Sequence, residues 1–242
     1  VKSHPSYGHL NRSCPAMPTS DVKSITPQRK QNTSRKRSSN SIFLTSCTCP
    51  GVAHDFGYAP ETSAWGSPIK REEDGPLVPF AAVNDIHELS DLKKPDPWSD
   101  GYMAIALRDY AWYAEHMDPR IGSEWGHFHG YGRCMGVESG ALVLGYERYL
   151  IELYEHPKLI HDWNQRVVEL NIDYVRAQES ITGKIDRLVV TDHLAGQVRR
   201  EHCEEFVYPY LRKYLMHFPT PPFGSITMKI LYQMMQSMRS LI

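Results

Sequence analysis

Short β-branched segments alternate with long amphipathic helices through the second half of this chain, and the alternation restricts the folds open to it. Residues 119–128 read as a strand, and two helices are predicted, one over 139–156 and one from Pro157 to about Tyr174. A β-branched run at 185–191 predicts another strand, and a helical pattern follows over about 199–214. Strands that alternate with helices along the chain are typical of a parallel sheet whose strands are connected by helices. The sequence therefore predicts an α/β fold.

These two predicted helices meet at Pro157. A proline fits the first turn of a helix, where its missing N–H has no partner to lose. Two further helices are predicted upstream, a short one that begins near Asn84 and stops before the prolines of "KPDP", and one over "YMAIALRDYAWYAEHM". After Pro157 one helix face carries apolar side chains at three- and four-residue steps, namely Leu159, Ile160, Trp163, Val167, Leu170 and Tyr174.

Charge divides the chain into two unlike parts. Of 242 residues, the first 50 hold eight of the 27 Lys and Arg residues and one of the 28 acids, and they are rich in Ser, Thr and Pro. Such a segment buries too little apolar surface to offset the entropy of ordering. We predict a disordered basic tail over 1–50. Its run "SRKRSSNS" is read as an ordinary tail feature rather than a nuclear-import or nucleic-acid patch.

Composition also excludes several classes of protein. No apolar run approaches the roughly 20 residues of a membrane span, and no signal peptide is recognisable, so a soluble cytoplasmic protein is expected. The five cysteines lack the paired spacing of a disulfide scaffold or a zinc module and are expected to be free thiols. They are Cys14, Cys47, Cys49, Cys134 and Cys203.

Asp192 and His193 stand where the predicted strand 185–191 gives way to a loop. Parallel α/β folds collect their chemistry at the carboxyl ends of strands, which makes the pair a candidate active site. The alternative is that both residues have a structural role only. Asp192 would then cap the following loop, and His193 would be partly buried and hydrogen-bonded.

Several stretches in order resemble the uroporphyrinogen decarboxylase superfamily. They are "ETSAWGSPI", "DIHELSDLKKPDPWSDG", "PRIGSEWGHFHGYGRCMGVESG", "YERYLIELYEHPKLIHDW" and "LVVTDHLAGQVRREHCEEFVYPYLRKYL". The resemblance covers about 51–219 and implies a (β/α)₈ TIM barrel with its site at the carboxyl ends of the strands. At about 31 residues per unit, this segment is expected to supply five or six of the eight units. We therefore expect an incomplete barrel.

An incomplete barrel leaves sheet edges that need a cover. A second copy of the chain is one candidate, which makes a homo-oligomer possible. The C-terminal segment 220–242 is predicted to form an amphipathic helix and is another candidate. Its methionine-rich face is expected to pack on its own domain or to self-associate, although such a face can also bind a partner helix or a lipid surface.

The resemblance implies a lyase that removes a carboxyl group from a tetrapyrrole in porphyrin biosynthesis. The alternative within the superfamily is a corrinoid-dependent methyltransferase, for which the partner would be a corrinoid protein and the substrate a methylated compound. A third hypothesis is a truncated derivative without catalysis. The expected ligand is a small molecule, and neither nucleic acid nor membrane is an expected partner.

The resemblance also assigns roles to residues. Asp55 lies near the family's aspartate, with slightly different spacing to Trp65, and would bind the ring. His193 stands where the decarboxylase has a serine, which brings the chain closer to the methyltransferase-like relatives; it would exchange a proton, with Asp192 orienting it. His127 and Tyr131 are expected to line the pocket.

Two features of the family are missing from the sequence. Arg35 and Arg37 lack the Gly-rich context of the family's carboxylate-binding arginines, so weak binding of porphyrins is expected. No His-x-Cys zinc motif follows Phe218, and we predict no bound metal and no cofactor. His127 and His129 share one side of a strand but would need a third ligand, so they are expected to be hydrogen-bonded or solvent-facing.

Overall fold

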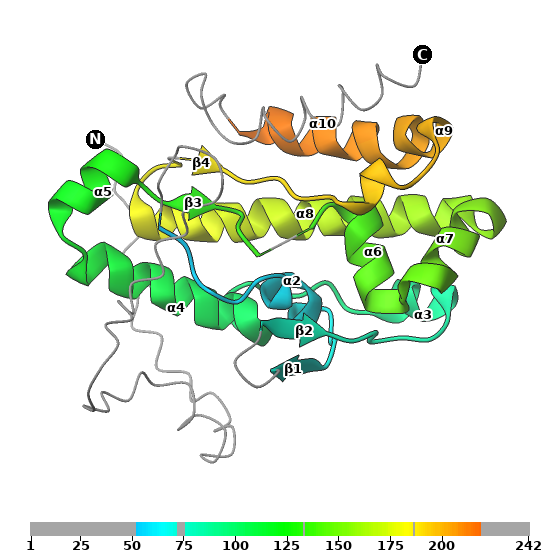
Figure 1. Cartoon of the computed structure of the whole chain (residues 1–242), viewed down its shortest axis with the longest axis horizontal. Helices are drawn as coiled ribbons and strands as arrows, with labels where there is room; N and C mark the ends of the chain where they lie inside the picture. The colour runs from blue at the N-terminus through cyan, green and yellow to red at the C-terminus, as the bar shows by residue number, and fades with distance from the viewer. Residues whose placement is uncertain (1–51, 72–75, 133, 186, 219–242) are drawn as a thin grey trace, which may run out of the picture. The chain divides into compact units, whose positions relative to one another are not determined.

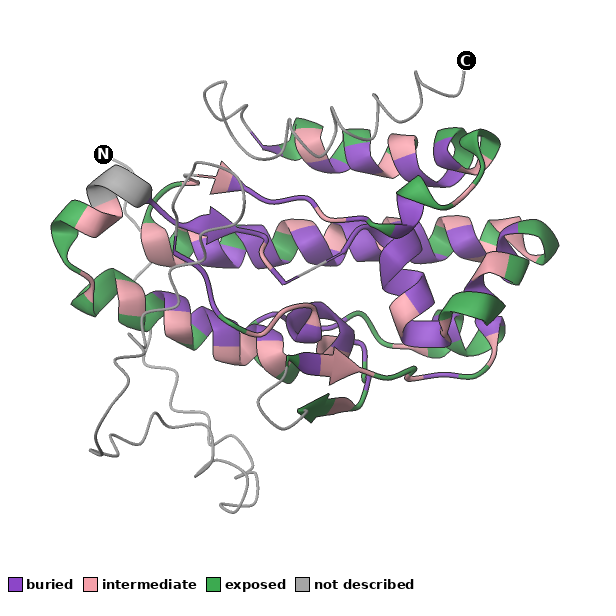
Figure 2. Ribbon diagram, in the orientation of Figure 1, coloured by how far each residue is buried: buried purple, intermediate pink, exposed green. Residues whose placement is uncertain are grey.

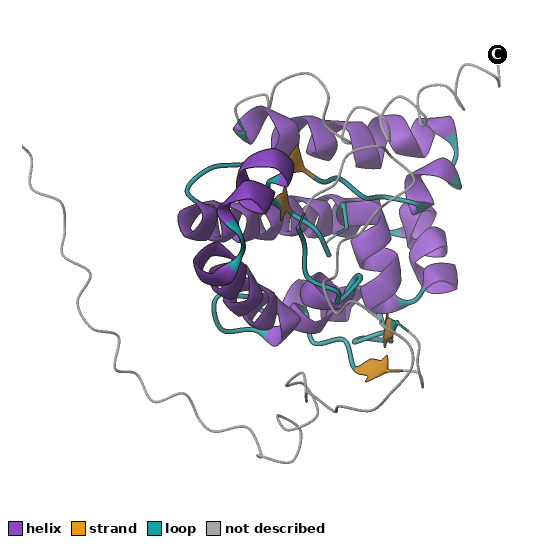
Figure 3. Ribbon diagram, turned by 60° about the vertical axis from the view of Figure 1, so that its left-hand side comes forward, coloured by secondary structure: helices purple, strands orange, loops and turns teal. Residues whose placement is uncertain are grey.

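The structure, a computed structural model, describes residues 52–71, 76–132, 134–185 and 187–218. The predicted basic tail over 1–50 and the predicted helix over 220–242 lie outside the described residues. Helices make up most of the described part, with only short strands among them (Figure 3). None of the described helices is long and apolar enough to cross a membrane.

Three chain segments run parallel to one another. Val52 forms a parallel bridge with His127, and strand β3 (Phe128–His129) pairs in parallel with strand β4 (Arg187–Leu188). The Phe128 N–H donates to the Val52 carbonyl (2.9 Å), and the Val189 N–H donates to the His129 carbonyl (2.9 Å). Helices connect each segment to the next, as the α/β prediction requires.

The barrel does not close within the described residues, and the expected five or six units are reduced to three parallel segments. The estimate was wrong because it assumed connections of ordinary length. The first connection, residues 53–126, contains four helices and a small antiparallel hairpin, and the second, residues 130–186, contains three helices. The hairpin consists of β1 (Ile69–Arg71) and β2 (Leu77–Pro79).

The first connection contains one clear error of prediction. Most of the strand expected over 119–128 is a helix, α5 (Pro119–Trp125), and only its end reaches β3. The side chain of Asp118 accepts the Arg120 N–H (2.9 Å), and Pro119 follows in the first turn. An Asp cap followed by Pro is a helix start signal, and it outweighs the weak alternation of polar and apolar residues.

The two helices predicted upstream of residue 119 are present, whereas the short helix Ala59–Ala64 was not predicted. Asp85 caps the short helix α3 (Ile86–Asp91), which is preceded in the chain by α2 (Ala59–Ala64) and followed by α4 (Gly101–His116). The two helices expected from 139 to about 174 are divided further, and the second extends to Thr182. They consist of α6 (Gly136–Leu144), α7 (Tyr146–Glu155) and α8 (Pro157–Thr182), with Gly145 at φ +102° separating the first two.

The last helical run, Arg200–His217, contains a change of helix type. It comprises α9 (Arg200–His202), a π-helical turn (Cys203–Val207) and α10 (Tyr208–His217). Pro209 follows the π turn and has no N–H to donate to the carbonyl four residues earlier. The wider turn accommodates the proline without ending the helix. The helix predicted over 199–214 is thus present, as two α-helical parts joined by the π-helical turn.

Helix α8 is central among the described helices, and α4, α6, α7 and α10 pack around it (Figure 1). Its inward face is buried along most of its length (Figure 2). Trp163 on this face packs against Trp65 with ring centroids 4.6 Å apart, and the Arg166 guanidinium lies 5.2 Å from the Trp65 ring. The largest fully buried side chains in the core include Trp65, Tyr110, Tyr149, Trp163, Tyr174, Phe206 and Tyr214.

Three fully buried amides on α8, seven residues apart, support the surrounding loops. Asn164 Nδ2 donates to the Phe206 carbonyl (2.9 Å), and Asn171 Nδ2 donates to the Cys134 carbonyl (2.8 Å). Gln178 Oε1 accepts the Gly130 N–H (2.6 Å). Seven residues are about two turns, so the amides lie along one face. One helix thereby holds both the segment after β3 and the final helical run.

Replacing Gly140 with alanine is expected to destabilise the fold. A Cβ at this position of α6 would overlap the ring of Tyr149, which is itself fully buried. Overpacking of this kind costs about 1–3 kcal/mol, more than the roughly 1 kcal/mol that alanine gains over glycine in a helix. Urea denaturation should show a lower midpoint for the variant.

Gly196→Ala is the matched control, because nothing lies within 4 Å of a Cβ built at Gly196. Its midpoint should stay close to that of the native protein. If Gly140→Ala were as stable as Gly196→Ala, the packing of Gly140 against Tyr149 would be wrong.

Candidate active site

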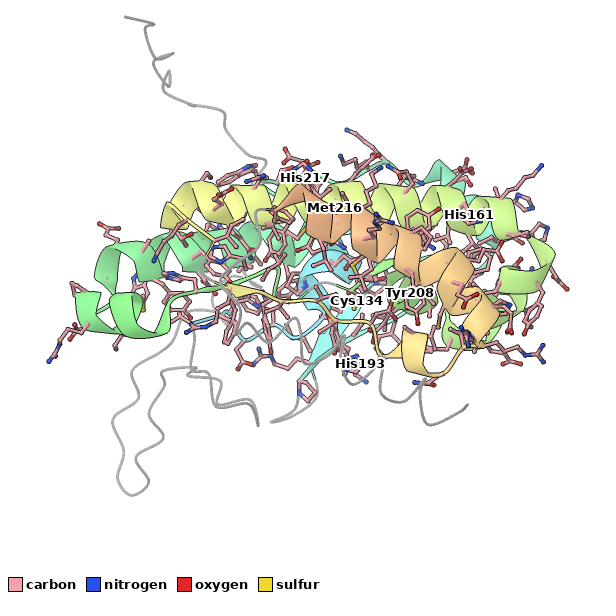
Figure 4. The ribbon with its side chains drawn as sticks, turned by 90° about the horizontal axis from the view of Figure 1, so that it is seen from above. Cys134, His161, His193, Tyr208, Met216 and His217 are labelled. Carbon is pink, nitrogen blue, oxygen red and sulfur yellow. The ribbon has the colours of Figure 1, made fainter. Side chains whose placement is uncertain are left out.

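The loops that follow the three parallel segments bring polar side chains to one end of the small sheet. Asp55 and Tyr58 follow Val52, Tyr131 follows β3, and His193 follows β4. Because the segments are parallel, their carboxyl ends lie at the same edge. Figure 4 labels His193 and Cys134 in the loops after β4 and β3.

Glu138 holds His193. The imidazole Nδ1 lies 3.0 Å from Oε1 and 3.2 Å from Oε2 of Glu138, and the His193 backbone N–H donates to Oε2 (2.6 Å). The Glu138 side chain is 3% exposed, whereas that of His193 is 63% exposed. A carboxylate on Nδ1 favours the proton at that nitrogen and leaves Nε2 as the other proton-exchanging atom. The pair therefore has the geometry of an oriented acid or base.

Tyr58 contacts the same imidazole. Its hydroxyl lies 3.1 Å from Nδ1 of His193, and the two rings meet edge to face with centroids 5.8 Å apart. Burial raises the pKa of Tyr58, and the nearby Cys134 and Glu138 raise it further. The phenol therefore keeps its proton across the physiological range and can donate a hydrogen bond.

Asp192 is buried and has a different partner from the one predicted. Its Oδ1 accepts the Ala195 N–H (2.9 Å), so it caps the short 3₁₀ turn Leu194–Gly196, while Oδ2 makes no hydrogen bond of normal geometry with any residue the structure describes. Thus the carboxylate that orients His193 is Glu138, and Asp192 performs the loop-capping role of the structural alternative.

The pKa of Asp192 is raised to about 8. Burial is the main cause, the carboxylates of Glu138 and Glu61 add to it, and the backbone N–H groups of Ala195 and Glu138 oppose it. Asp192 is therefore mostly a neutral acid at pH 7. We refer to Glu61, Glu138 and Asp192 as the acid cluster.

Glu61 joins the first and second connections at the site. This fully buried residue of α2 accepts hydrogen bonds from the Cys134 N–H and from the hydroxyl of Ser139, which neighbours Glu138 in α6. Tyr146, at the start of α7, is also affected by the cluster. Burial raises the pKa of Tyr146 to about 12, and Glu138 is the next largest cause.

His54 is a fixed neutral base beneath the first loop. Its Nε2–H donates to the Tyr131 carbonyl (2.9 Å), and its Nδ1 accepts the Phe56 N–H (3.2 Å), which together define one tautomer. Complete burial lowers the pKa of His54 to about 4, with the Tyr131 carbonyl opposing the shift. This histidine therefore links the loops after Val52 and β3 without carrying charge.

Asp55 and Tyr131, both predicted site residues, lie at the open edge. Asp55 is exposed and Tyr131 is half-buried. Burial raises the pKa of Tyr131, and the Asp55 carboxylate raises it further, which indicates that the two are close. Within the described ranges, no hydrogen bond or ion pair joins Asp55 to His193.

His127 is not in the loops that follow the parallel segments. It lies at the amino end of β3, buried, with its ring centroid 6.1 Å from that of Tyr110. His129 is also buried rather than solvent-facing, and its Nε2 lies 2.9 Å from the Thr182 hydroxyl. The two histidines flank an interior tyrosine and belong to the core. Cys134 and Cys203 are free thiols, as predicted for them.

Three residues of the site were not predicted from the sequence, namely Tyr58, Glu61 and Glu138. Glu138 stands in "GVESG", in the first turn of α6, where an acid is common simply because it favours the helix dipole. Only the folded chain brings Glu138 beside His193, 55 residues away. Local sequence carried no signal for this pairing.

Fold and site together define an α/β protein whose acid–base side chains gather at the carboxyl ends of parallel strands. The family model described as uroporphyrinogen decarboxylase (URO-D) matches residues 56–236, and the chain belongs to this family. The match confirms the resemblance found in the sequence, and the family suggests a TIM-barrel type of fold. Among curated proteins, none matches the chain.

Proposed function

We propose that the protein is a decarboxylase-like enzyme that replaces a carboxyl group of a small-molecule substrate with a proton. The observation that carries the proposal is the pair formed by buried Glu138 and exposed His193. Membership of the uroporphyrinogen decarboxylase family supports the reaction class at a coarser level.

The reaction needs one proton delivered to carbon. When the carboxyl group leaves as CO₂, the electron pair of the broken bond remains on the carbon, which then takes a proton. His193 would supply this proton from Nε2, since Glu138 holds Nδ1. General acid catalysis by a positioned side chain contributes typically 10²–10⁴-fold. Asp55, exposed at the same edge, would accept hydrogen bonds from N–H groups of the substrate.

The site suits a substrate with few negative charges. The acid cluster lies beneath His193, and Asp192 already keeps its proton, mainly because it is buried and also because the carboxylates of Glu138 and Glu61 are nearby. A tetrapyrrole with several carboxylate arms would need cationic partners, and the family's arginine motif is missing from the sequence. We therefore favour a related, less acidic molecule over uroporphyrinogen itself.

Weak binding is the expected result when uroporphyrin or coproporphyrin is titrated into the purified chain and followed by absorbance. Charge-assisted hydrogen bonds to carboxylates contribute roughly 1.5–3 kcal/mol each, so the loss of two weakens binding by about a hundredfold or more. Submicromolar affinity would contradict this expectation and would require a cationic clamp elsewhere in the chain.

A second candidate is methyl transfer of the corrinoid type, favoured by the histidine at position 193 and by the acidic surroundings of the site. Two assays separate the candidates. Release of CO₂ from carboxylated pyrroles supports the first, and transfer of a methyl group from methylcobalamin to a thiol supports the second. A folded chain active in neither assay would favour the non-catalytic derivative.

A further inference from the structure

A second group of ligand-type side chains lies outside the candidate active site, where α7 ends and α8 begins. Glu152, Glu155 and His156 each offer a ligand atom, and these atoms lie within 4.8 Å of one another. Glu155 is exposed and His156 is partly exposed, so solvent reaches the group. Among the residues the structure describes, no other group of His, Cys, Asp and Glu meets this spacing.

A second histidine from another element adjoins this group. The ring of His87, in the first turn of α3, meets the ring of His156 edge to face with centroids 5.4 Å apart. His87 is exposed, and its own backbone N–H is occupied by the Asp85 cap (2.9 Å). His87 therefore lies beside the group on an element far away in the sequence, although its ring nitrogens are not among the ligand atoms within 4.8 Å of one another.

Glu152, the buried member of the group, fixes the orientation of the His156 ring. Glu152 is fully buried, one of its oxygens contacts Nδ1 of His156, and the other lies 2.6 Å from Nε of Arg148. A carboxylate that holds one nitrogen of a histidine orients the other nitrogen, the arrangement found behind metal-binding histidines. With one arginine against two carboxylates, the group keeps a net negative charge that favours a cation.

We propose that Glu155 and His156, supported by Glu152, bind a divalent transition-metal ion, with zinc as the physiological candidate, and that the exposed His87 changes its side-chain rotamer to become a third ligand. Imidazole and carboxylate together suit Zn²⁺, whereas Mg²⁺ and Ca²⁺ prefer sites made entirely of oxygen. The ion would fasten α3 to the junction of α7 and α8, which makes the site structural. This proposal revises the expectation of a metal-free chain and is independent of the proposed reaction.

The test is a zinc titration of the full chain in competition with a chromophoric chelator, with excess Mg²⁺ present throughout. The wild-type chain should bind one equivalent, and the double variant His87→Ala/Glu155→Gln should bind it at least roughly 10- to 100-fold more weakly, the loss typical of removing only a supporting residue. Both side chains are exposed, so the double variant should fold normally. Zinc should also raise the Tm of the wild type but not that of the double variant.

His116→Ala is the matched control. His116 is an exposed histidine beside an acid, Glu115 (3.8 Å), but it belongs to no group of three ligands in the described part of the chain. Its loss should leave zinc binding unchanged. Equal zinc affinity and stoichiometry in the wild type and the double variant would overturn the proposal, and so would displacement of the bound zinc by Mg²⁺.

Discussion

Replacement of His193 by alanine is expected to abolish turnover while leaving the unfolding transition almost unchanged. The side chain is 63% exposed, so its removal takes little from the core. If it is the proton donor, its loss should lower kcat by about 10²–10⁴-fold. The measurement is kcat on the substrate found by the two assays, alongside a urea denaturation curve.

Two further variants sharpen this experiment. Glu138→Gln keeps the size of the side chain and an oxygen for the His193 N–H but removes the charge that holds Nδ1. It should lower kcat, and it should also change the pH profile of the reaction. His116→Ala, an exposed histidine remote in sequence from the site, should behave as the wild type. If turnover survives in His193→Ala, the role proposed for this residue is wrong.

Asp192→Asn is expected to remove a strong pH dependence of stability. The pKa of Asp192 is raised from 3.8 to about 8 in the folded chain, so between about pH 4 and pH 8 the folded state holds a proton that the unfolded state has lost. The free energy of unfolding therefore falls as pH rises through this window. The slope is at most about 1.4 kcal/mol per pH unit for this one proton. Below about pH 4 the Asp192 carboxyl is protonated in both the folded and the unfolded state, so it no longer makes the free energy of unfolding depend on pH.

Asparagine can still accept the Ala195 N–H at this position but carries no ionisable proton. The variant should therefore be more stable than the wild type at pH 8, with the difference shrinking toward pH 4. Urea denaturation at several pH values measures the difference, and Asp91→Asn, an exposed change on α3, serves as control. Parallel stability curves for the wild type and Asp192→Asn would show that Asp192 is ionised in the folded chain.

Most of the helices, though not α2 or α5, could be predicted because their signals are local. Pro157 begins α8 where expected, and the apolar face from Ile160 to Tyr174 is buried. The strands could not be predicted as well. Strand pairing within β3 and β4 is limited to two residues each, and short apolar runs such as 185–191 do not reveal how much of their length finds a partner.

The site was partly predictable for a related reason. The position of His193 after a β-branched run pointed to the carboxyl end of a strand, and the structure places it there. Its partners Glu138 and Tyr58 come from segments 55 and 135 residues away. Such pairings depend on the path of the whole chain, which no local pattern reports.

The three amides of α8 restrict how the length of this helix can change during evolution. Inserting one residue between Asn164 and Gln178 would turn everything beyond it by about 100° and move it 1.5 Å along the axis. Gln178 would then miss the Gly130 N–H, and a buried donor would be left without its partner. A step of seven residues would restore the helix face but move Gln178 by about 10.5 Å along the axis. Insertions and deletions of any length should therefore be disfavoured in this stretch, whereas the sequence of the outer face of α8 can drift freely.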